Sequence, residues 1–197
     1  MNSNHARVCT SPEWAQHIQQ DILPVLVRDA ELGTEMLEIG PGPGAATDWL
    51  RHRVGKLTAV EVDEAAAGKL ASQYAGTNVE IRHGSAAELD LADESVDSAG
   101  SFTMLHHVPT IALQNKILAE AFRVLRPGGV LIGSDSLAST GLHEFHAGDT
   151  YNPVEPASLL TRLQTIGFGP VTVSVGDSVT FIARKPAAAE ADGEARA

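Results

Sequence analysis

The chain has 197 residues, of which 43% are hydrophobic, and its formal net charge is −11. This length suits one well-buried domain, and the acidic balance argues against a nucleic acid partner, because phosphate contacts need Lys and Arg. No stretch reaches the roughly 18 apolar residues of a membrane span, and residues 1–10 lack a basic region followed by an apolar run. We therefore expect a cytoplasmic protein without a membrane anchor.

The two ends of the chain differ from its middle. Residues 186–197 are almost entirely Ala, Glu, Asp, Gly and Arg, which leaves nothing large to bury and predicts a disordered tail. Residues 1–185 are then expected to form a single domain that opens with a short helical leader. The single cysteine, Cys9, permits no internal disulfide.

The leader has a clear helix-start signal at residues 11–13 (SPE), where a capping hydroxyl, a proline and an acid follow one another. Apolar residues then recur at helical spacing at Trp14, Ile18 and Ile22. Pro24 is expected to break or restart the helix. The leader is too short to be a separate lid domain.

Residues 36–44 (MLEIGPGPG) form a short apolar run that leads into three alternating glycines. Glycine lets the backbone adopt conformations closed to other residues, and it lets a ligand approach the main chain. Pro41 and Pro43 stiffen the loop. A helix expected from about Ala45 would point its free N–H groups and its positive dipole end at the loop. These features predict a cofactor-binding loop.

The glycine spacing distinguishes this loop from the Gly-x-Gly-x-x-Gly loop of dinucleotide-binding domains. Glu38-x-Gly40-x-Gly42-x-Gly44 resembles the first motif of the class I S-adenosylmethionine-dependent methyltransferases. The resemblance implies that S-adenosylmethionine is the cofactor and that Glu38 holds its amino group. It further implies that the loop wraps the amino-acid end of the cofactor with Gly40, Pro41, Gly42 and Gly44.

Residues 57–62 form an apolar run with an acid near its end, which predicts a buried strand. Glu61 follows Gly40 by 21 residues, close to the offset of about 20 at which nucleotide-binding α/β folds place the acid that binds the ribose. A carboxylate offers two acceptor oxygens to the two hydroxyls. Asp63 competes for this role but is better placed to cap the next helix. We assign the ribose to Glu61, with the adjacent Val62 in the cofactor site.

A third strand is predicted at residues 79–84, and Ser85 follows it. The family usually has an acid in the position of Ser85, where it accepts a hydrogen bond from the adenine amino group. A serine hydroxyl accepts that bond more weakly, so adenine recognition is expected to use backbone groups of Ser85 and Ala86. Phe102 and Thr103, after the fourth strand, resemble the substrate-facing end of the sheet and complete the predicted cofactor site.

The remaining sequence completes an α/β pattern. Its predicted elements are a strand at 95–101, an amphipathic helix from Ile111 to Val124, a stop-and-turn at 125–129 within RVLRPGGVL, a strand at 130–135, a helix ending at Gly167, and a hairpin of 171–175 and 179–183. We predict an α/β fold with a doubly wound, mostly parallel seven-stranded sheet, an antiparallel C-terminal hairpin and helices on both faces. That layout is similar to the class I methyltransferases rather than to the dinucleotide-binding fold.

Candidate catalytic residues are sought beyond the carboxyl ends of the fourth and fifth strands, where ligands of open α/β sheets bind. His106 and His107 follow the fourth strand. The segment of about seventeen residues at 136–152 follows the fifth, and it exceeds the usual length of such connections. The extra length predicts a lid or a substrate wall. It contains His143, Glu144, His146, Asp149 and Tyr151.

Methyl transfer needs a base only when the acceptor atom carries a proton that must leave. The sharpest hypothesis is that His146, oriented by Asp149, removes that proton, while Tyr151 and Phe102 line the acceptor pocket; His106 is a further catalytic candidate. The simpler alternative is that these histidines only cap or pack. A divalent ion bound by His143, His146 and Asp149 has suitable ligand types, but loop spacing alone does not support it, and no metal is predicted.

Together these features predict methyl transfer from S-adenosylmethionine to a small aromatic or heteroaromatic molecule of the natural-product type, such as an indole-containing cyclic dipeptide. The alternatives are an O- or N-methyltransferase of a primary metabolite, a nicotinamide-dependent oxidoreductase, and a non-catalytic cofactor binder. A core without a substrate domain leaves the sulfonium facing water. We therefore expect a homodimer whose second copy completes the pocket, with exchanged terminal elements as one way to do so.

Overall fold

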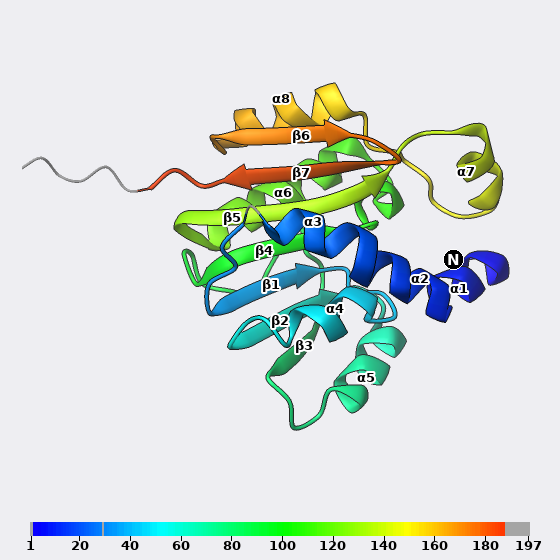
Figure 1. The fold of residues 1–197 in the computed structure, drawn as a ribbon, viewed down its shortest axis with the longest axis horizontal. Coiled ribbons are helices and arrows are strands. Elements are labelled where there is room, and N and C mark those ends of the chain that lie inside the picture. Colours follow the sequence, from blue (N-terminus) through cyan, green and yellow to red (C-terminus); the bar gives the residue numbers. More distant parts are fainter. Residues whose placement is uncertain (1, 29, 188–197) are drawn as a thin grey trace, which may run out of the picture.

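The computed structural model describes residues 2–28 and 30–187, so most of the tail predicted at 186–197 lies outside the described residues. The chain forms a seven-stranded sheet of order β3-β2-β1-β4-β5-β7-β6 (Figure 1). Its strands are β1 (Glu35–Ile39), β2 (Lys56–Glu61), β3 (Val79–His83), β4 (Val96–Phe102), β5 (Leu125–Ser136), β6 (Val171–Val175) and β7 (Ser178–Arg184). The pairs among β1 to β5 are parallel, whereas β7 is antiparallel to both β5 and β6. This confirms the predicted fold class.

Helices cover both faces of the sheet. One apolar cluster joins the strands to η1 (Ile18–Ile22), α3 (Leu23–Arg28) and α4 (Ala45–Leu50). The other joins them to α6 (Ile111–Val124) and α8 (Pro156–Ile166). α5 (Glu64–Gln73) packs against β2 and β3. Within the described ranges, none of the helices combines the length and apolar character needed to cross a bilayer.

The central strand β1 is apolar because both of its faces are covered. Met36, Leu37 and Ile39 are fully buried there between β2 and β4. Glu38 is the exception, since a carboxyl group occupies a position that the pattern reserves for apolar side chains. Burying an acid is costly unless it has a partner, so its presence in the central strand marks the place where the fold serves binding rather than stability.

The C-terminal part of the fold follows its sequence signals closely. α8 is capped by Glu155 and ends at Gly167, which has a φ of 121° that suits glycine. In the hairpin, Val175 pairs with Val179 across Gly176 and Asp177. The hairpin places β7 directly beside β5 and so completes the predicted antiparallel edge.

Two predicted breaks take a milder form in the structure. The π-helical segment η1 gives way to α3, which begins at Leu23 and has Pro24 as its second residue, so the helix restarts there without leaving its course. α6 ends at Val124, as the stop signal predicted, but β5 begins at once at Leu125, earlier than expected. Residues 126–129 leave the register, since Leu125 pairs with Val96 and Val130 with Ser98, and Gly128 has a φ of 82°. The Gly128 N–H donates to the Lys185 carbonyl at 2.9 Å.

Two short helices meet beyond the carboxyl ends of β1, β4 and β5, on the right in Figure 1. α1 (Ser3–Cys9) precedes the predicted leader helix α2 (Pro12–His17), and α7 (Thr140–Phe145) lies inside the long segment 136–152. They are joined through Asn2, whose N–H donates to Asp149 Oδ2 at 2.7 Å and whose side chain donates to the Phe145 carbonyl at 2.9 Å. The chain thus supplies a wall of its own beyond the carboxyl ends of these strands, which weakens our reason for expecting a homodimer, although the dimer itself stays a prediction.

Candidate active site

The loop between β1 and α4 is shaped by glycines with positive φ. Gly40 has a φ of 65°, and a Cβ there would lie 2.3 Å from Cγ of Met104. Gly44, with a φ of 91°, caps α4, and a Cβ there would lie 2.9 Å from the Tyr74 hydroxyl, which donates to the Gly44 carbonyl. Gly42 also has a positive φ, of 53°. Only glycine allows this backbone to pack so closely against its neighbours.

A cavity of about 370 Å³ opens beside this loop. Such a volume lies within the usual range for small-molecule sites, roughly 300–1,000 Å³. Gly44 is the one predicted cofactor residue that does not line it. The residues that do are Glu38, Gly40, Pro41, Gly42, Glu61, Val62, Ser85, Ala86, Phe102 and Thr103. The spacing of sequence motifs therefore identified one continuous cavity.

Glu38 lies on the floor of this cavity with only 1% of its surface exposed. Its Oε2 accepts a hydrogen bond of 2.7 Å from the Thr47 hydroxyl of α4. Burial, and to a lesser extent the nearby charge of Glu61, raise the pKa of Glu38 to about 7. A positively charged ligand group beside Glu38 would favour its ionised form, so the site is suited to an ammonium group.

Glu61 ends β2 and lines the same cavity. Its two carboxyl oxygens accept hydrogen bonds from the N–H groups of Gly42, at 3.3 Å, and Asp63, at 3.0 Å. The competing acid, Asp63, instead accepts a hydrogen bond from the Ala66 N–H and caps α5, as predicted. Glu61 is therefore held in place by main-chain donors, and each of its oxygens has a further lone pair for a ligand.

Ser85 lies at the outer end of the cavity after β3. Its hydroxyl oxygen accepts a weak bond of 3.2 Å from the Ala87 N–H, so its O–H remains a possible donor and its second lone pair an acceptor. Ala86 packs against the apolar cluster under α6. This arrangement fits recognition by the backbone of Ser85 and Ala86 rather than by a strong side-chain acceptor.

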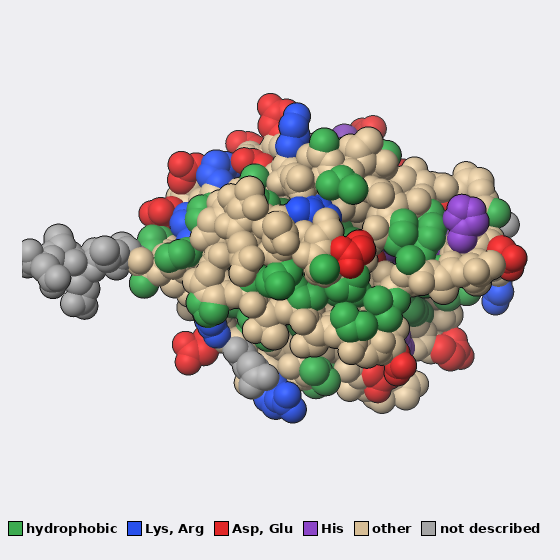
Figure 2. All heavy atoms as spheres, turned by 90° about the horizontal axis from the view of Figure 1, so that it is seen from above, with side chains coloured by type: hydrophobic (Ala, Val, Ile, Leu, Met, Phe, Trp, Pro, Cys, Tyr) green, Lys and Arg blue, Asp and Glu red, His purple; other side chains and the backbone are tan. Residues whose placement is uncertain are grey.

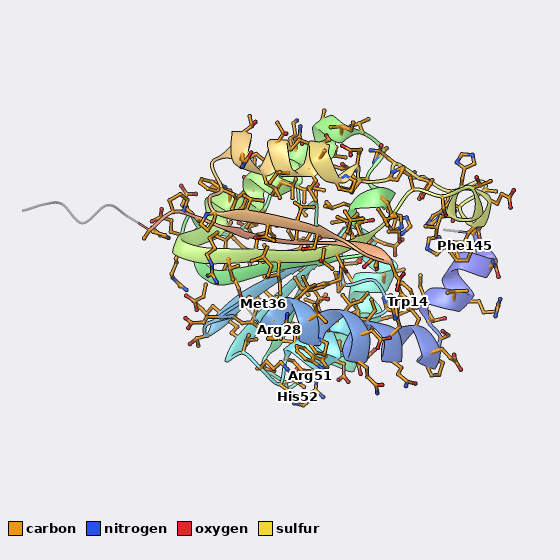
Figure 3. The ribbon with its side chains drawn as sticks, turned by 45° about the horizontal axis from the view of Figure 1, so that its top comes forward. Trp14, Arg28, Met36, Arg51, His52 and Phe145 are labelled. Carbon is orange, nitrogen blue, oxygen red and sulfur yellow. The ribbon has the colours of Figure 1, made fainter. Side chains whose placement is uncertain are left out.

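A second cavity, of about 210 Å³, adjoins the first. The two share the wall residues Cys9, Trp14, Thr103 and His107. The other wall residues come from α1, from the 3-10 segment η2 (Leu105–His107), from the end of β5 and from α7. In Figure 3, the labelled Trp14 and Phe145 lie at this end of the sheet, where α1 and α7 approach each other. The leader and the long segment after β5 thus both line this cavity, whereas the sequence had predicted a lid or wall only for the segment 136–152.

Thr103 stands where the two cavities join. Its φ is 52°, which is unusual for a β-branched residue. Its N–H is bonded to the Ser134 carbonyl on β5, and its hydroxyl donates to the Phe102 carbonyl at 2.8 Å. Such backbone strain persists only where the surroundings impose it, and it is frequent at functional sites.

His106 lines the second cavity and forms a buried pair with Asp135 behind it. Nδ1 of His106 lies 2.6 Å from Oδ1 of Asp135, and the His106 N–H also donates to Oδ2 at 3.3 Å. Asp135 has no exposed surface and accepts a third hydrogen bond, from the Ser136 N–H. Because Nδ1 faces the carboxylate and donates to it, the ring can accept a proton only at Nε2.

The predicted pairing of His146 with Asp149 does not occur. Nδ1 of His146 donates to the Leu142 carbonyl at 2.7 Å, because His146 follows α7 and faces its last turn. Asp149 instead lies 3.2 Å from Nδ1 of His5 on α1. Tyr151 stacks on the ring of His146 with centroids 4.5 Å apart and lies behind the cavity wall rather than on it. Of the predicted acceptor-pocket pair, only Phe102 reaches a cavity, and it is the first.

Sequence reasoning missed Asp135 and His5. Asp135 could have been found, because it is an acid at the carboxyl end of the strand next to His106. His5 gives no such signal, since its role depends on α1 folding back. Burial, with the nearby imidazoles of His106, His5 and His146, lowers the pKa of His107 to about 3. His107 is therefore neutral at physiological pH and unsuited to be the base.

Comparison with known proteins agrees with this geometry. A family model described as "Methyltransferase domain" matches residues 37–133. The chain is 34% identical over 143 residues to a protein of Mycolicibacterium smegmatis named "Probable S-adenosylmethionine-dependent methyltransferase"; the match covers 69% of this chain and 52% of that protein. The family model thus covers the chain from β1 to β5, and the similarity to the Mycolicibacterium smegmatis protein extends over most of the chain.

Solved structures show the same fold. A methyltransferase of Haloferax volcanii, solved in complex with the methyltransferase activator Trm112, superimposes with a TM-score of 0.75 at 15% identity over 94% of this chain and 99% of that one. A S-adenosylmethionine-dependent methyltransferase of Aquifex aeolicus gives a TM-score of 0.72 at 18% identity, with the same coverage of 94% and 99%. At such identities the likeness concerns the fold alone.

The fold and the cavity beside the glycine loop define a domain built to bind a nucleotide-like cofactor at the carboxyl edge of a parallel sheet. The chain belongs to the class I S-adenosylmethionine-dependent methyltransferases, whose methyl donor is S-adenosylmethionine. It spans about half the length of the mycobacterial relative that it matches. What that relative acts on therefore does not transfer to this chain.

Proposed function

We propose that this protein transfers a methyl group from S-adenosylmethionine to a small aromatic or heteroaromatic acceptor in the second cavity. The observation that carries the proposal is the buried His106–Asp135 pair, whose histidine lines a small cavity that adjoins the cofactor cavity. A non-catalytic cofactor binder has no need for such a pair. An oxidoreductase of the dinucleotide-binding kind would lack a use for the acid at Glu38.

The first cavity offers the hydrogen-bonding groups that the cofactor needs. Glu38 would hold the ammonium group, the Gly40 to Gly44 loop would wrap the amino-acid end, and Glu61 would accept the two ribose hydroxyls. Both acids already face the cavity, and one of them is buried with a single hydrogen-bond partner, Thr47. S-adenosylmethionine supplies an activated methyl group on a sulfonium, so the protein mainly has to align the two reactants and exclude water.

The second cavity limits the size and the type of the acceptor. Its volume of about 210 Å³ is below the roughly 300–1,000 Å³ typical of drug-sized ligands. Its wall carries the indole of Trp14, the ring of Phe145 and several imidazoles, all of which can stack on a flat ring. A single-ring or bicyclic group suits this space, so of an indole-containing cyclic dipeptide only the indole would enter it.

In the proposed step, the acceptor atom loses its proton to Nε2 of His106 and uses the freed electron pair to attack the methyl carbon. The bond from that carbon to sulfur breaks with its electron pair left on sulfur, which gives the neutral thioether S-adenosylhomocysteine. Asp135 holds the ring of His106 in one tautomer and stabilises the imidazolium that forms. Thr103 and His107 line the passage between the two cavities, so they would position the acceptor atom.

The proposal is tested by transfer of a labelled methyl group into a panel of small aromatic phenols, amines and indoles, with products identified by mass spectrometry. His106→Asn should lower kcat by about 10²–10⁴-fold and leave the affinity for S-adenosylhomocysteine unchanged in calorimetry. His52→Ala, at an exposed histidine, is the matched control. Equal turnover of His106→Asn and wild type would refute the role of His106 as the base. Binding of a nicotinamide cofactor in place of S-adenosylmethionine would refute the proposed reaction.

A further inference from the structure

Three histidines from distant parts of the chain meet at the second cavity. They are His5 on α1, His107 at the end of η2 and His146 just after α7, and each offers a ring nitrogen within 4.8 Å of the other two. Their ring centroids are 4.5–5.3 Å apart. His5 and His146 are almost completely buried. Both nitrogens of a buried imidazole usually have a hydrogen-bond partner, so a partner is expected for each ring nitrogen of this cluster.

The hydrogen bonds of His146 leave one nitrogen without a partner. Nδ1 lies 2.7 Å from the Leu142 carbonyl, which can only accept, so Nδ1 carries the proton and Nε2 carries a lone pair. Nε2 is buried and has no hydrogen-bond partner. Leaving such a buried acceptor unsatisfied is unfavourable. A cation bound to Nε2 would remove that cost.

His5 is held in a similar way. Its Nδ1 lies 3.2 Å from Oδ2 of Asp149, which also accepts the Asn2 N–H at 2.7 Å. The ring of His107 lies against both, with its centroid 4.9 Å from that of His5 and 5.3 Å from that of His146. His5 and His146 thus each use one nitrogen on a carboxylate or main-chain group and keep the other. This is how metal-ligating histidines are oriented, because the outer partner sets the tautomer and the direction of the lone pair.

The ligand set selects a class of ion. Three neutral imidazoles suit Zn²⁺ and neighbouring divalent transition metals rather than Mg²⁺ or Ca²⁺, which prefer oxygen. Zn–N bonds of about 2.0–2.1 Å would place the nitrogens about 3.4 Å apart, so the rings need to move together by at most about 1.5 Å. Three protein ligands with an open fourth position are typical of catalytic rather than structural zinc. All three histidines line the second cavity, so the open position faces the acceptor.

We propose that His5, His107 and His146 bind one divalent transition metal ion of the zinc class, and that this ion holds the acceptor atom for methylation. The role of the ion toward the acceptor rests on the proposed function, whereas the metal site itself does not. A thiol or phenol acceptor would bind the ion through sulfur or oxygen, and its proton would pass to His106. The electron pair left on that atom forms the new bond to the methyl carbon, and the departing sulfur keeps the pair of the broken bond.

The site is tested by titrating the untagged full chain, first stripped with a chelator, with Zn²⁺ in a calorimeter and with Co²⁺ in a spectrophotometer. We expect one ion per chain and the intense visible bands of low-coordinate Co²⁺. His146→Ala should weaken binding by more than 100-fold, and Asp149→Asn, which removes an outer partner, by about 10–100-fold. His143→Ala, an exposed histidine on α7, should bind as wild type does.

Thermal melting of each metal-free variant shows whether it is folded; if His146→Ala is not, His5→Gln and Asp149→Asn decide in its place. Absence of stoichiometric binding by wild type, or equal binding by the His146 and His143 variants, overturns the site. Methyl transfer is measured separately. Loss of transfer on chelation with unchanged S-adenosylhomocysteine affinity supports the role toward the acceptor, and full transfer by metal-free enzyme overturns that role while the site stands. If no acceptor is methylated at all, the proposed function fails, and the titration still decides the site.

Discussion

The two cavities adjoin each other but are built in different ways. Most of the walls of the cofactor cavity come from residues next to the ends of β1, β2, β3 and β4, each within a short motif, and the leader and α6 add the rest. The acceptor cavity is lined mainly by α1, η2 and α7, and the hydrogen bond between Asn2 and Asp149 that joins its two sides spans 147 positions. Cofactor binding therefore depends mainly on the sheet, whereas acceptor binding depends mainly on short helices that only tertiary contacts hold in place.

The largest effect that separates the two cavities is expected at Asp135. Asp135→Asn keeps the size of the side chain but replaces the acceptor that fixes the tautomer of His106, so kcat should fall by about 10²–10⁴-fold. The affinity for S-adenosylhomocysteine should not change, because Asp135 does not line the cofactor cavity. Steady-state kinetics and calorimetry measure the two quantities. Asp177→Asn in the exposed hairpin turn is the control, and unchanged kcat in Asp135→Asn would show that the pair is only structural.

The next largest effect is expected at Glu38, in the cofactor cavity. It concerns the stability of the protein as well as its affinity for the cofactor. Its pKa is raised from 4.5 to about 7 in the folded protein, so the folded state binds more protons between these values. Its contribution to stability is therefore fully present below pH 4.5 and lost as the pH rises through about 7. The loss amounts to about 3 kcal/mol, at about 1.4 kcal/mol per pKa unit.

Glu38→Gln should accordingly raise the free energy of unfolding by about 3 kcal/mol at pH 8 and by little at pH 4, while the Gln oxygen still accepts from Thr47. Cofactor affinity should drop, because the ammonium group loses its counter-charge. In wild type, that affinity should weaken as the pH falls below about 7 and Glu38 is protonated. Urea unfolding and calorimetry across pH test both expectations, with exposed Glu64→Gln as the charge control. Lower stability of Glu38→Gln at pH 8 would contradict this account.

A smaller effect is expected in the glycine loop. Gly40→Ala forces a side chain into a positive φ and towards Met104 on the cavity wall, so cofactor affinity should fall by roughly 10–100-fold, or about 1–3 kcal/mol. Gly76→Ala has a similar φ of 76° with open space around its Cβ. Both variants should lose about 1–2 kcal/mol of stability, but only the first should lose affinity. Equal affinities in calorimetry would mean that the loop does not approach the ligand.

The same contrast explains which features of the fold and the site could be predicted from the sequence. The glycine spacing, the acid at Glu61 and the hairpin signals are local, and they predicted the mostly parallel sheet, its antiparallel hairpin and one wall of the site. Asp149 was assigned to His146, a near neighbour in sequence, but it faces His5, because the position of α1 is decided by packing rather than by any motif. The strand at Leu125 was predicted too late, since the bond from Gly128 to Lys185 depends on a distant partner.

The smallest predicted effect probes the wall made by α7. Phe145 lines the acceptor cavity, and its ring centroid lies 4.9 Å from that of His5. Phe145→Ala should raise the acceptor KM about fivefold, because an aromatic contact of about 1 kcal/mol is lost, with kcat and cofactor affinity nearly unchanged. Phe122→Ala removes a ring that packs on Phe168, at 4.9 Å between centroids and away from both cavities. It should lower the melting temperature without changing the KM. A change of cofactor affinity in Phe145→Ala, but not of the KM, would mean that α7 belongs to the cofactor cavity, and the division between a sheet-built and a helix-built half would be wrong.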